Sequence, residues 1–126
     1  MKMYDCVPAR RRTCLESALK AFRQRSGEGI AAVLSDDVEL TSLLAEPALR
    51  ERGIVRGREA VRRYFENRFA ECSEVDITDV MEGELGTMLL LRHGRNSVAL
   101  AVAYDDQDCV RRIDVWHSVG ADFGIP

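Results

Sequence analysis

The feature that most constrains the fold is an alternation of apolar and polar residues in the C-terminal half of the chain. It runs through residues 74–82, 87–93, 97–104 and 109–119. Such alternation is typical of β-strands. The short links between these segments are rich in glycine, asparagine and aspartate, which is the composition of hairpin turns. The pattern therefore predicts an antiparallel meander.

The N-terminal half is predicted to be mainly helical. From residue 13 onwards, apolar side chains recur at helical spacing, and Thr13 with Glu16 forms a capping box that predicts the start of the first helix. A short second helix is predicted from residue 29, and a third in residues 58–72. The residues expected on the inner side of the third helix are Val61, Tyr64, Phe65, Arg68 and Phe69.

Two further strands are predicted between the second and third helices, in residues 37–44 and 53–56. Together these elements predict one α+β domain, in which three helices from the N-terminal half pack on one face of a curved antiparallel sheet. We expect the domain to span residues 13–126. Residues 1–12 show no periodicity, so we expect a flexible leader there.

The strands at 87–91 and 98–103 are apolar on both sides. An antiparallel sheet with one face in water alternates more cleanly than this. Helices can cover only one face, so a second copy of the chain is expected to cover the other. The sequence thus predicts a homodimer formed through the sheet.

Composition excludes several classes of protein. Apolar residues make up 46% of the chain and charged residues 31%, as in an ordinary globular domain. No apolar run approaches the roughly 20 residues of a membrane span, and the first residues lack the apolar region of a secretory signal. The four cysteines lie far apart without metal-ligand spacing. We expect a cytoplasmic protein with reduced thiols, no metal and no required cofactor.

The first 25 residues are basic, with seven Lys or Arg against Asp5 and Glu16. Such a segment can contact nucleic acid or an acidic partner protein. These charges do not alternate regularly with aromatic residues, as they do on many nucleic-acid-binding surfaces. A solvated helix face is therefore the favoured interpretation, and a nucleic-acid partner is disfavoured.

The last predicted strand contains "VRRIDVWH", residues 110–117. Alternation places Arg112, Asp114 and Trp116 on one face, opposite Ile113 and its neighbours. If Asp114 faces an apolar pocket, desolvation raises its pKa and makes it a usable proton-transfer group. Alternatively, Asp114 forms a surface ion pair with Arg112. The sequence leaves open which face of this strand lines a pocket.

Three segments carry a family resemblance: "GIAAVLSDDVEL", "VRGREAVRRYF" and "VRRIDVWH". In this order the chain resembles the nuclear-transport-factor-2-like superfamily, especially its SnoaL-like branch, which is related to polyketide cyclases. The resemblance implies a cone-shaped α+β fold with a deep apolar pocket between the helices and the concave sheet face. It also implies frequent dimers. It does not define a function, because this fold carries enzymes, ligand binders and assembly modules.

Ketosteroid isomerases share this fold, and the resemblance places their three functional positions near Ser42, Ala18 and Leu100. None of the three supplies the carboxylate or tyrosine that the isomerase chemistry needs, so activity of that type is not expected. The cyclases have an inward-facing aspartate on a late strand, and Asp114 stands at a comparable point. The resemblance, together with burial of Trp116, therefore favours an arrangement in which Asp114 and Trp116 face the helices. The opposing arrangement buries Ile113 and Val115 against the helices instead. The histidines suit general-base chemistry, but His117 falls on the opposite face and His93 at a strand end.

The sequence therefore predicts a domain that binds a small, mostly apolar molecule. As an acid/base enzyme of cyclase, isomerase or hydrolase type, it would use Asp114 for proton transfer, with Trp116, Arg112 and Tyr64 binding the substrate. The alternative is a non-catalytic ligand-binding or dimerisation module on the same fold. A third alternative is a nucleic-acid or acidic partner bound through the basic N-terminal segment. Whether the chain is an enzyme stays open.

Overall fold

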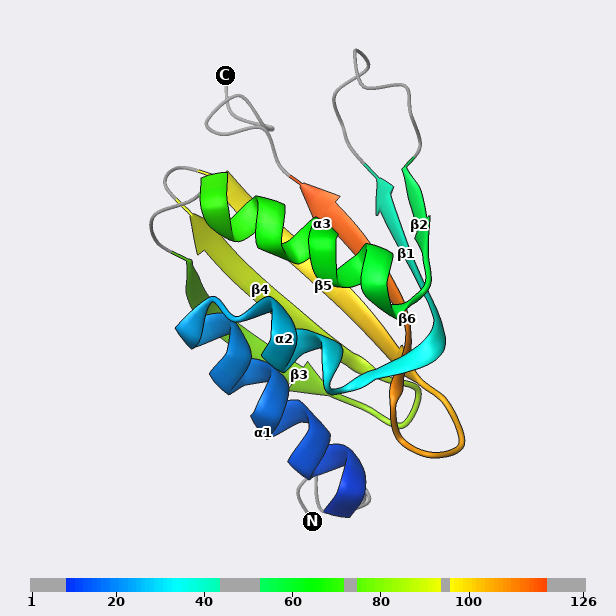
Figure 1. The fold of residues 1–126 in the computed structure, drawn as a ribbon. Coiled ribbons are helices and arrows are strands. Elements are labelled where there is room, and N and C mark those ends of the chain that lie inside the picture. The colour runs from blue at the N-terminus through cyan, green and yellow to red at the C-terminus, as the bar shows by residue number, and fades with distance from the viewer. Residues whose placement is uncertain (1–8, 44–52, 72–74, 94–95, 118–126) are drawn as a thin grey trace.

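The computed structural model describes residues 9–43, 53–71, 75–93 and 96–117. It has three helices and six strands in these ranges. In chain order they are α1 (Ala9–Gln24), α2 (Gly27–Ala31), β1 (Leu34–Leu43), β2 (Ile54–Arg56), α3 (Arg58–Glu71), β3 (Asp76–Glu82), β4 (Thr87–His93), β5 (Asn96–Tyr104) and β6 (Val110–His117). The helices lie on one face of a single sheet, which confirms the predicted α+β class (Figure 1).

The six-stranded sheet has the order β2-β1-β6-β5-β4-β3. Strands β3 to β6 form the predicted antiparallel meander, and β1 pairs with β2 antiparallel. However, β1 pairs with β6 in parallel, so the sheet is mixed and the expectation of a wholly antiparallel sheet is wrong at this pair. The pairing begins where the chain leaves α2, because the Val110 N–H donates a 2.8 Å hydrogen bond to the Val33 carbonyl.

Helix α1 begins at Ala9, earlier than the start predicted at Thr13. The Thr13 hydroxyl does not cap the helix; it donates a 3.1 Å hydrogen bond to the Ala9 carbonyl. The added turn is held by ion pairs from Arg10 and Arg11 to Asp108 in the β5–β6 turn. Residues 1–8 of the predicted leader lie outside the described ranges.

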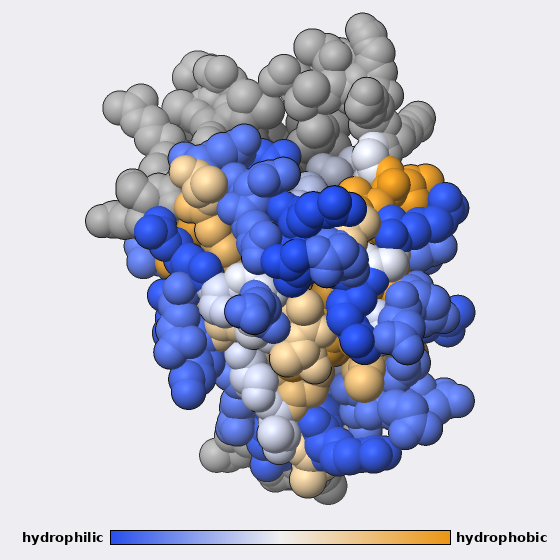
Figure 2. All heavy atoms as spheres, viewed as in Figure 1, coloured by the Kyte–Doolittle hydropathy of each residue, from blue (hydrophilic) through white to orange (hydrophobic). Residues whose placement is uncertain are grey.

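Helix α2 is a single short turn that is capped by Ser26, whose Oγ accepts a 3.0 Å hydrogen bond from the Gly29 N–H. It begins at Gly27, two residues before the predicted start, and ends at Ala31, and the chain is extended from Leu34 onward as β1. Seen from the helix side, the surface of the molecule is largely hydrophilic (Figure 2). Within the described ranges, the helices are too short or too polar to cross a bilayer.

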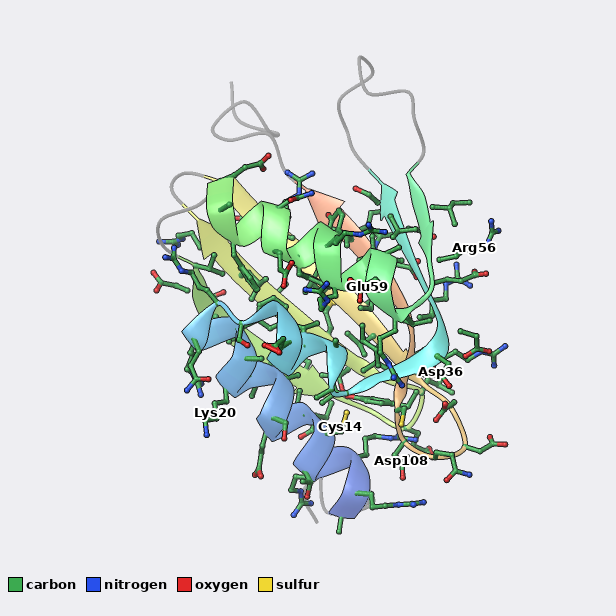
Figure 3. The ribbon with its side chains drawn as sticks, viewed as in Figure 1. Cys14, Lys20, Asp36, Arg56, Glu59 and Asp108 are labelled. Carbon is green, nitrogen blue, oxygen red and sulfur yellow. The ribbon has the colours of Figure 1, made fainter. Side chains whose placement is uncertain are left out.

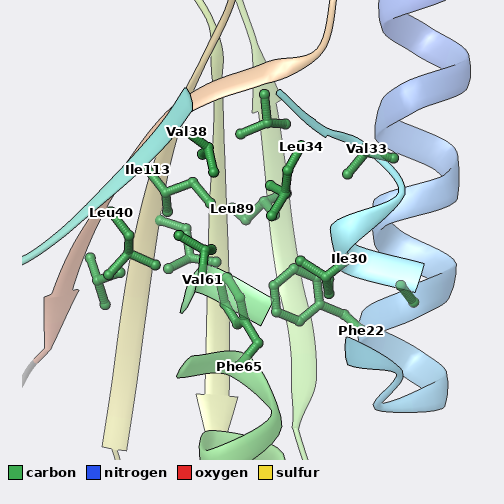
Figure 4. Close-up of a cluster of buried hydrophobic side chains, with 14 of the residues drawn as sticks. Phe22, Ile30, Val33, Leu34, Val38, Leu40, Val61, Phe65, Leu89 and Ile113 are labelled. Atoms are coloured by element: carbon green, nitrogen blue, oxygen red, sulfur yellow. The ribbon is translucent and has the colours of Figure 1, made fainter. Parts of the chain in front are cut away.

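The hydrophobic core lies between the helices and the sheet (Figure 4). Phe22 from α1 meets Phe65 from α3 edge to face, with ring centres 5.6 Å apart. Ile30 and Leu34 join them from the α2–β1 segment, and Leu89 comes from the sheet below. Since these side chains come from elements distant in sequence, the core holds α1 and α3 over the same sheet face.

Candidate functional site

Strand β6 has one buried and one open face. Ile113 and Val115 belong to the core, whereas Trp116 is exposed and Asp114 is only partly buried. The expectation that Asp114 and Trp116 face the helices is therefore wrong. Burying two apolar side chains there avoids the desolvation penalty of burying the charged pair Asp114 and Arg112. A β-bulge lies between the Tyr104–Val110 and Ala103–Arg112 pairs of β5 and β6. It determines which side chains of β6 point toward the core from Arg112 onward.

Asp114 lies on the sheet face opposite the helices, here called the outer face. Arg112 Nε donates a 3.3 Å hydrogen bond to Asp114 Oδ1, so the ion pair expected as the alternative is present. Across the sheet, Asp114 is paired with Ala101 on β5 and Thr41 on β1. Its role in catalysis stays a prediction, and any substrate of Asp114 would have to bind on this outer face.

A shallow groove of about 460 Å³ runs along the outer face and is here called the outer groove. Ala101 and Ala103 form its floor, Arg112 and Asp114 one wall, and the β3–β4 hairpin the other. Met81, Leu85 and Met88 on that hairpin are exposed apolar side chains. The groove is thus apolar on one side and charged on the other.

The helix side of the sheet contains a small apolar space, here called the helix-side cavity, of about 50 Å³. Its lining residues are Phe22, Tyr64, Phe65, Arg68, Phe69, Val75, Leu91, Val98, Leu100 and Val115. A second cavity of about 30 Å³ lies nearer α2. Phe22, Phe65 and Leu100 border both and divide the interior. The space is much smaller than the deep pocket that the family resemblance implies.

The polar groups of the helix-side cavity are at its edge. Tyr64 packs edge to face on Phe65, and the Arg68 guanidinium lies 5.3 Å from the centre of the Tyr64 ring. Arg68 Nη1 also donates a 3.1 Å hydrogen bond to Glu71 Oε1. Among the described lining residues there is no carboxylate or histidine. The cavity as described therefore supplies no group for acid/base chemistry near neutral pH.

The three positions that the resemblance aligned with isomerase groups can now be placed. Leu100 lines both cavities, and Ala18 lines the one near α2. Ser42 lies near the end of β1 and is partly buried. Leucine and alanine cannot transfer a proton, so these cavities lack the isomerase groups at the two positions that reach them.

A partly buried polar pair, Thr87 and Tyr104, lies at the second cavity, which Tyr104 lines. The hydroxyls of Thr87 and Tyr104 are 2.7 Å apart, and the Arg11 guanidinium lies 4.8 Å from the centre of the Tyr104 ring. Burial raises the pKa of Tyr104, and the hydrogen bond with Thr87 opposes this effect. Both groups therefore have structural partners, and Arg11 of the basic segment is held against the body of the protein.

Cys14 on α1 lies at the same end of the molecule as Asp108 in the β5–β6 turn (Figure 3). Burial raises the pKa of the Cys14 thiol to about 11, and the nearby Cys109, Asp108 and Asp105 add to the effect. Cys14 and Cys109 are both unpaired thiols. A high thiol pKa disfavours the reactive thiolate, so Cys14 has the character of a packing residue.

The side chains of His93 and His117 lie outside the described part of the structure. In the described ranges, no three His, Cys, Asp or Glu residues lie together as a metal site requires.

Comparison with solved structures identifies the class of this fold. A steroid delta-isomerase from Pseudomonas aeruginosa superposes with a TM-score of 0.74 at 12% identity, covering 90% of this chain and 83% of that one. A SnoaL-like protein of unknown function from Burkholderia thailandensis gives 0.71 at 12% identity, covering 90% and 98%. An NTF2-like protein of unknown function from Mesorhizobium loti gives 0.73 at 6% identity, covering 86% and 91%.

The chain therefore has the nuclear-transport-factor-2-like fold, as the sequence resemblance predicted, and SnoaL-like proteins are among its structural neighbours. No family model matches the sequence, and no curated protein matches it. At such low identities the likeness extends to the fold and not to the activity.

Arg68 was predicted on the correct side of the third helix, but the sequence did not identify it as a residue of the candidate site. It was expected on the inner side of the third helix, and it lines the helix-side cavity with Tyr64. The spacing in the sequence indicated this position, because an arginine four residues after a tyrosine lies on the same face of a helix. Helical spacing alone could not show that Tyr64 and Arg68 lie at the edge of an apolar cavity.

Proposed function

We propose that the chain is a non-catalytic binding module for a small apolar ligand, which enters between α3 and the sheet. The observation that carries the proposal is the distribution of polar groups in the helix-side cavity. Its walls are aliphatic and aromatic, and Tyr64 and Arg68 stand at the edge. Ligand sites commonly combine apolar walls with a few polar groups that orient the ligand.

The cavity must enlarge to hold a ligand. A cavity of about 150 Å³ is enough for benzene in an engineered protein, and the space here is smaller. Tyr64 is the side chain that is placed to open it, because it is only partly buried while Phe65 and Phe69 behind it belong to the core. Outward rotation of Tyr64 would widen the cavity toward solvent at the cost of its edge-to-face contact with Phe65.

Leu100 and Ala101 provide a matched pair of variants, because they are adjacent on β5 and face opposite sides of the sheet. We use indole, a small neutral aromatic molecule, as the probe in isothermal titration calorimetry. Leu100→Phe fills the helix-side cavity and should remove indole binding, whereas Ala101→Val enlarges a side chain on the outer face and should leave binding unchanged.

Overpacking at Leu100 is expected to lower the unfolding free energy by about 1–3 kcal/mol, so the melting temperature of each variant is measured first. Val98→Leu adds one methylene to the same cavity and serves as a milder variant. If the native protein does not bind indole at millimolar concentration, or if Leu100→Phe binds it normally, the proposed site is wrong.

A second function is favoured by the outer face: assembly of two copies through the sheet. Trp116 projects from β6, and the small residues Ala99, Ala101 and Ala103 lie beside it on β5. A ridge and an alanine floor on one face are self-complementary, because a two-fold axis can place the Trp116 of each copy over the alanines of the other. Met81 and Met88 extend the apolar surface.

The charges on the outer face suit the same arrangement. Arg112 and Asp114 lie next to each other at one wall of the outer groove, with opposite signs. In a two-fold assembly, each can meet the opposite charge of the partner copy. Catalysis by Asp114 in this groove is the remaining alternative, and it would require the groove to stay open to a substrate.

A further inference from the structure

Tyr64 and Arg68 are one helical turn apart on α3 and both line the helix-side cavity. Residues four positions apart in a helix lie on the same face. Among the described residues that line this cavity, Arg68 is the one with a charged side chain. The described lining of the cavity therefore has a single positive charge at its edge and apolar walls behind it.

Arg68 has hydrogen-bonding capacity that the described part of the protein does not use. The guanidinium carries five N–H donors, and Glu71 accepts from one of them. Within the described ranges, the other donors meet no hydrogen-bond acceptor. The Arg68 side chain is 44% exposed, so a ligand at the cavity edge can reach it from solvent.

We propose that Arg68 binds the carboxylate of an apolar monocarboxylic acid whose ring or chain occupies the helix-side cavity. This inference rests on the proposed ligand-binding function and names the class of its ligand. Guanidinium and carboxylate groups match in shape and charge, and such hydrogen bonds are stronger than neutral ones. Glu71 beside Arg68 disfavours a ligand with two negative charges, such as a phosphate monoester.

The probes are 3-phenylpropanoate and its neutral analogue 3-phenylpropanamide, which differ mainly in charge. Calorimetry at neutral pH and low salt measures the affinity of each. The native protein should bind the acid about tenfold more tightly than the amide, because one charge-assisted contact distinguishes them. Arg68→Gln should abolish this preference, and Arg63→Gln, an exposed arginine on the same helix, should retain it.

Glu71→Gln provides a test in the opposite direction. It removes the competing carboxylate on Arg68, so the acid should bind more tightly while the affinity for the amide stays the same. A merely structural role of Arg68 would not produce this selective gain. Melting temperatures of all variants establish that each is folded.

The outcomes separate this inference from the proposed function. If the acid and the amide bind equally in the native protein, or if Arg68→Gln keeps the preference, Arg68 is not the carboxylate contact, although the cavity still binds ligands. If neither probe binds and indole does not bind either, the ligand-binding function itself fails. Selective loss in Arg68→Gln together with selective gain in Glu71→Gln supports both.

Discussion

Val115 and Trp116 are adjacent on β6 and face opposite sides of the sheet. Val115 is 1% exposed and borders the helix-side cavity, whereas Trp116 is 52% exposed and is paired with Ala99 on the outer face. One strand thus contributes to two surfaces of different chemistry. We assign ligand binding to the first surface and assembly to the second.

Trp116→Glu is expected to convert a dimer into a monomer. The change replaces an exposed indole with a charge on the surface that we assign to the interface, and a buried carboxylate without a partner is strongly unfavourable. Size-exclusion chromatography with light scattering at micromolar concentration measures the mass. Asn67→Glu adds the same charge at an exposed position of α3, away from the outer face, and should leave the dimer intact. A monomeric native protein, or a dimeric Trp116→Glu variant, would contradict the assembly.

Asp114→Asn is expected to leave indole binding unchanged, because Asp114 lies on the opposite side of the sheet from the cavity. The unfolding free energy should change by less than about 0.5 kcal/mol, since the Arg112 partner is largely exposed. Calorimetry and thermal unfolding check the two expectations. Loss of binding would place the ligand on the outer face. If a turnover is found and disappears in this variant, Asp114 acts there as the proton-transfer group.

The Cys14 thiol predicts a pH dependence of stability at alkaline pH. Its folded pKa of about 11 lies above the ordinary value of 9.0 for a cysteine thiol, so the unfolded chain loses this proton first as the pH rises. The contribution of the Cys14 thiol to the free energy of unfolding is fully present below pH 9 and is lost between pH 9 and 11. Because the thiol is partly exposed, the loss is on the order of 1 kcal/mol.

Urea unfolding at several pH values from 8 to 11 measures this effect. Cys14→Ser should be less stable at pH 8 and should lose less stability than the native protein over the same range. Tyr104 also has a raised pKa and adds a decline that the variant retains. Equal declines in the two proteins would show that Cys14 does not contribute.

Much of the fold could be predicted from periodicity. The strands β3 to β6 and the helix α3 lie where alternation and helical spacing placed them, because each buries one face against the same core. The parallel pairing of β1 with β6 could not be predicted this way. It joins segments far apart in the chain, and periodicity carries no information about which strands are neighbours.

The inward face of β6 was predicted wrongly for a physical reason. Both faces of "VRRIDVWH" contain apolar residues, and the family resemblance favoured the face with Trp116. The core instead takes Ile113 and Val115, since burying Trp116 inward would have buried Arg112 and Asp114 with it. The early start of α1 was missed because its stabilising contact, Arg11 with Asp108, is long-range.

The central claim is that a small apolar ligand binds on the helix side of the sheet. Intermolecular nuclear Overhauser effects between indole and methyl groups of the native protein test it most directly, because Leu100 and Val115 face the cavity while Ala101 and Met88 face away. If the ligand lies in the helix-side cavity, indole contacts the methyls of Leu100 and Val115 and not those of Ala101 and Met88. Contacts to Ala101 and Met88 alone would place the ligand in the outer groove and rule out binding in the helix-side cavity.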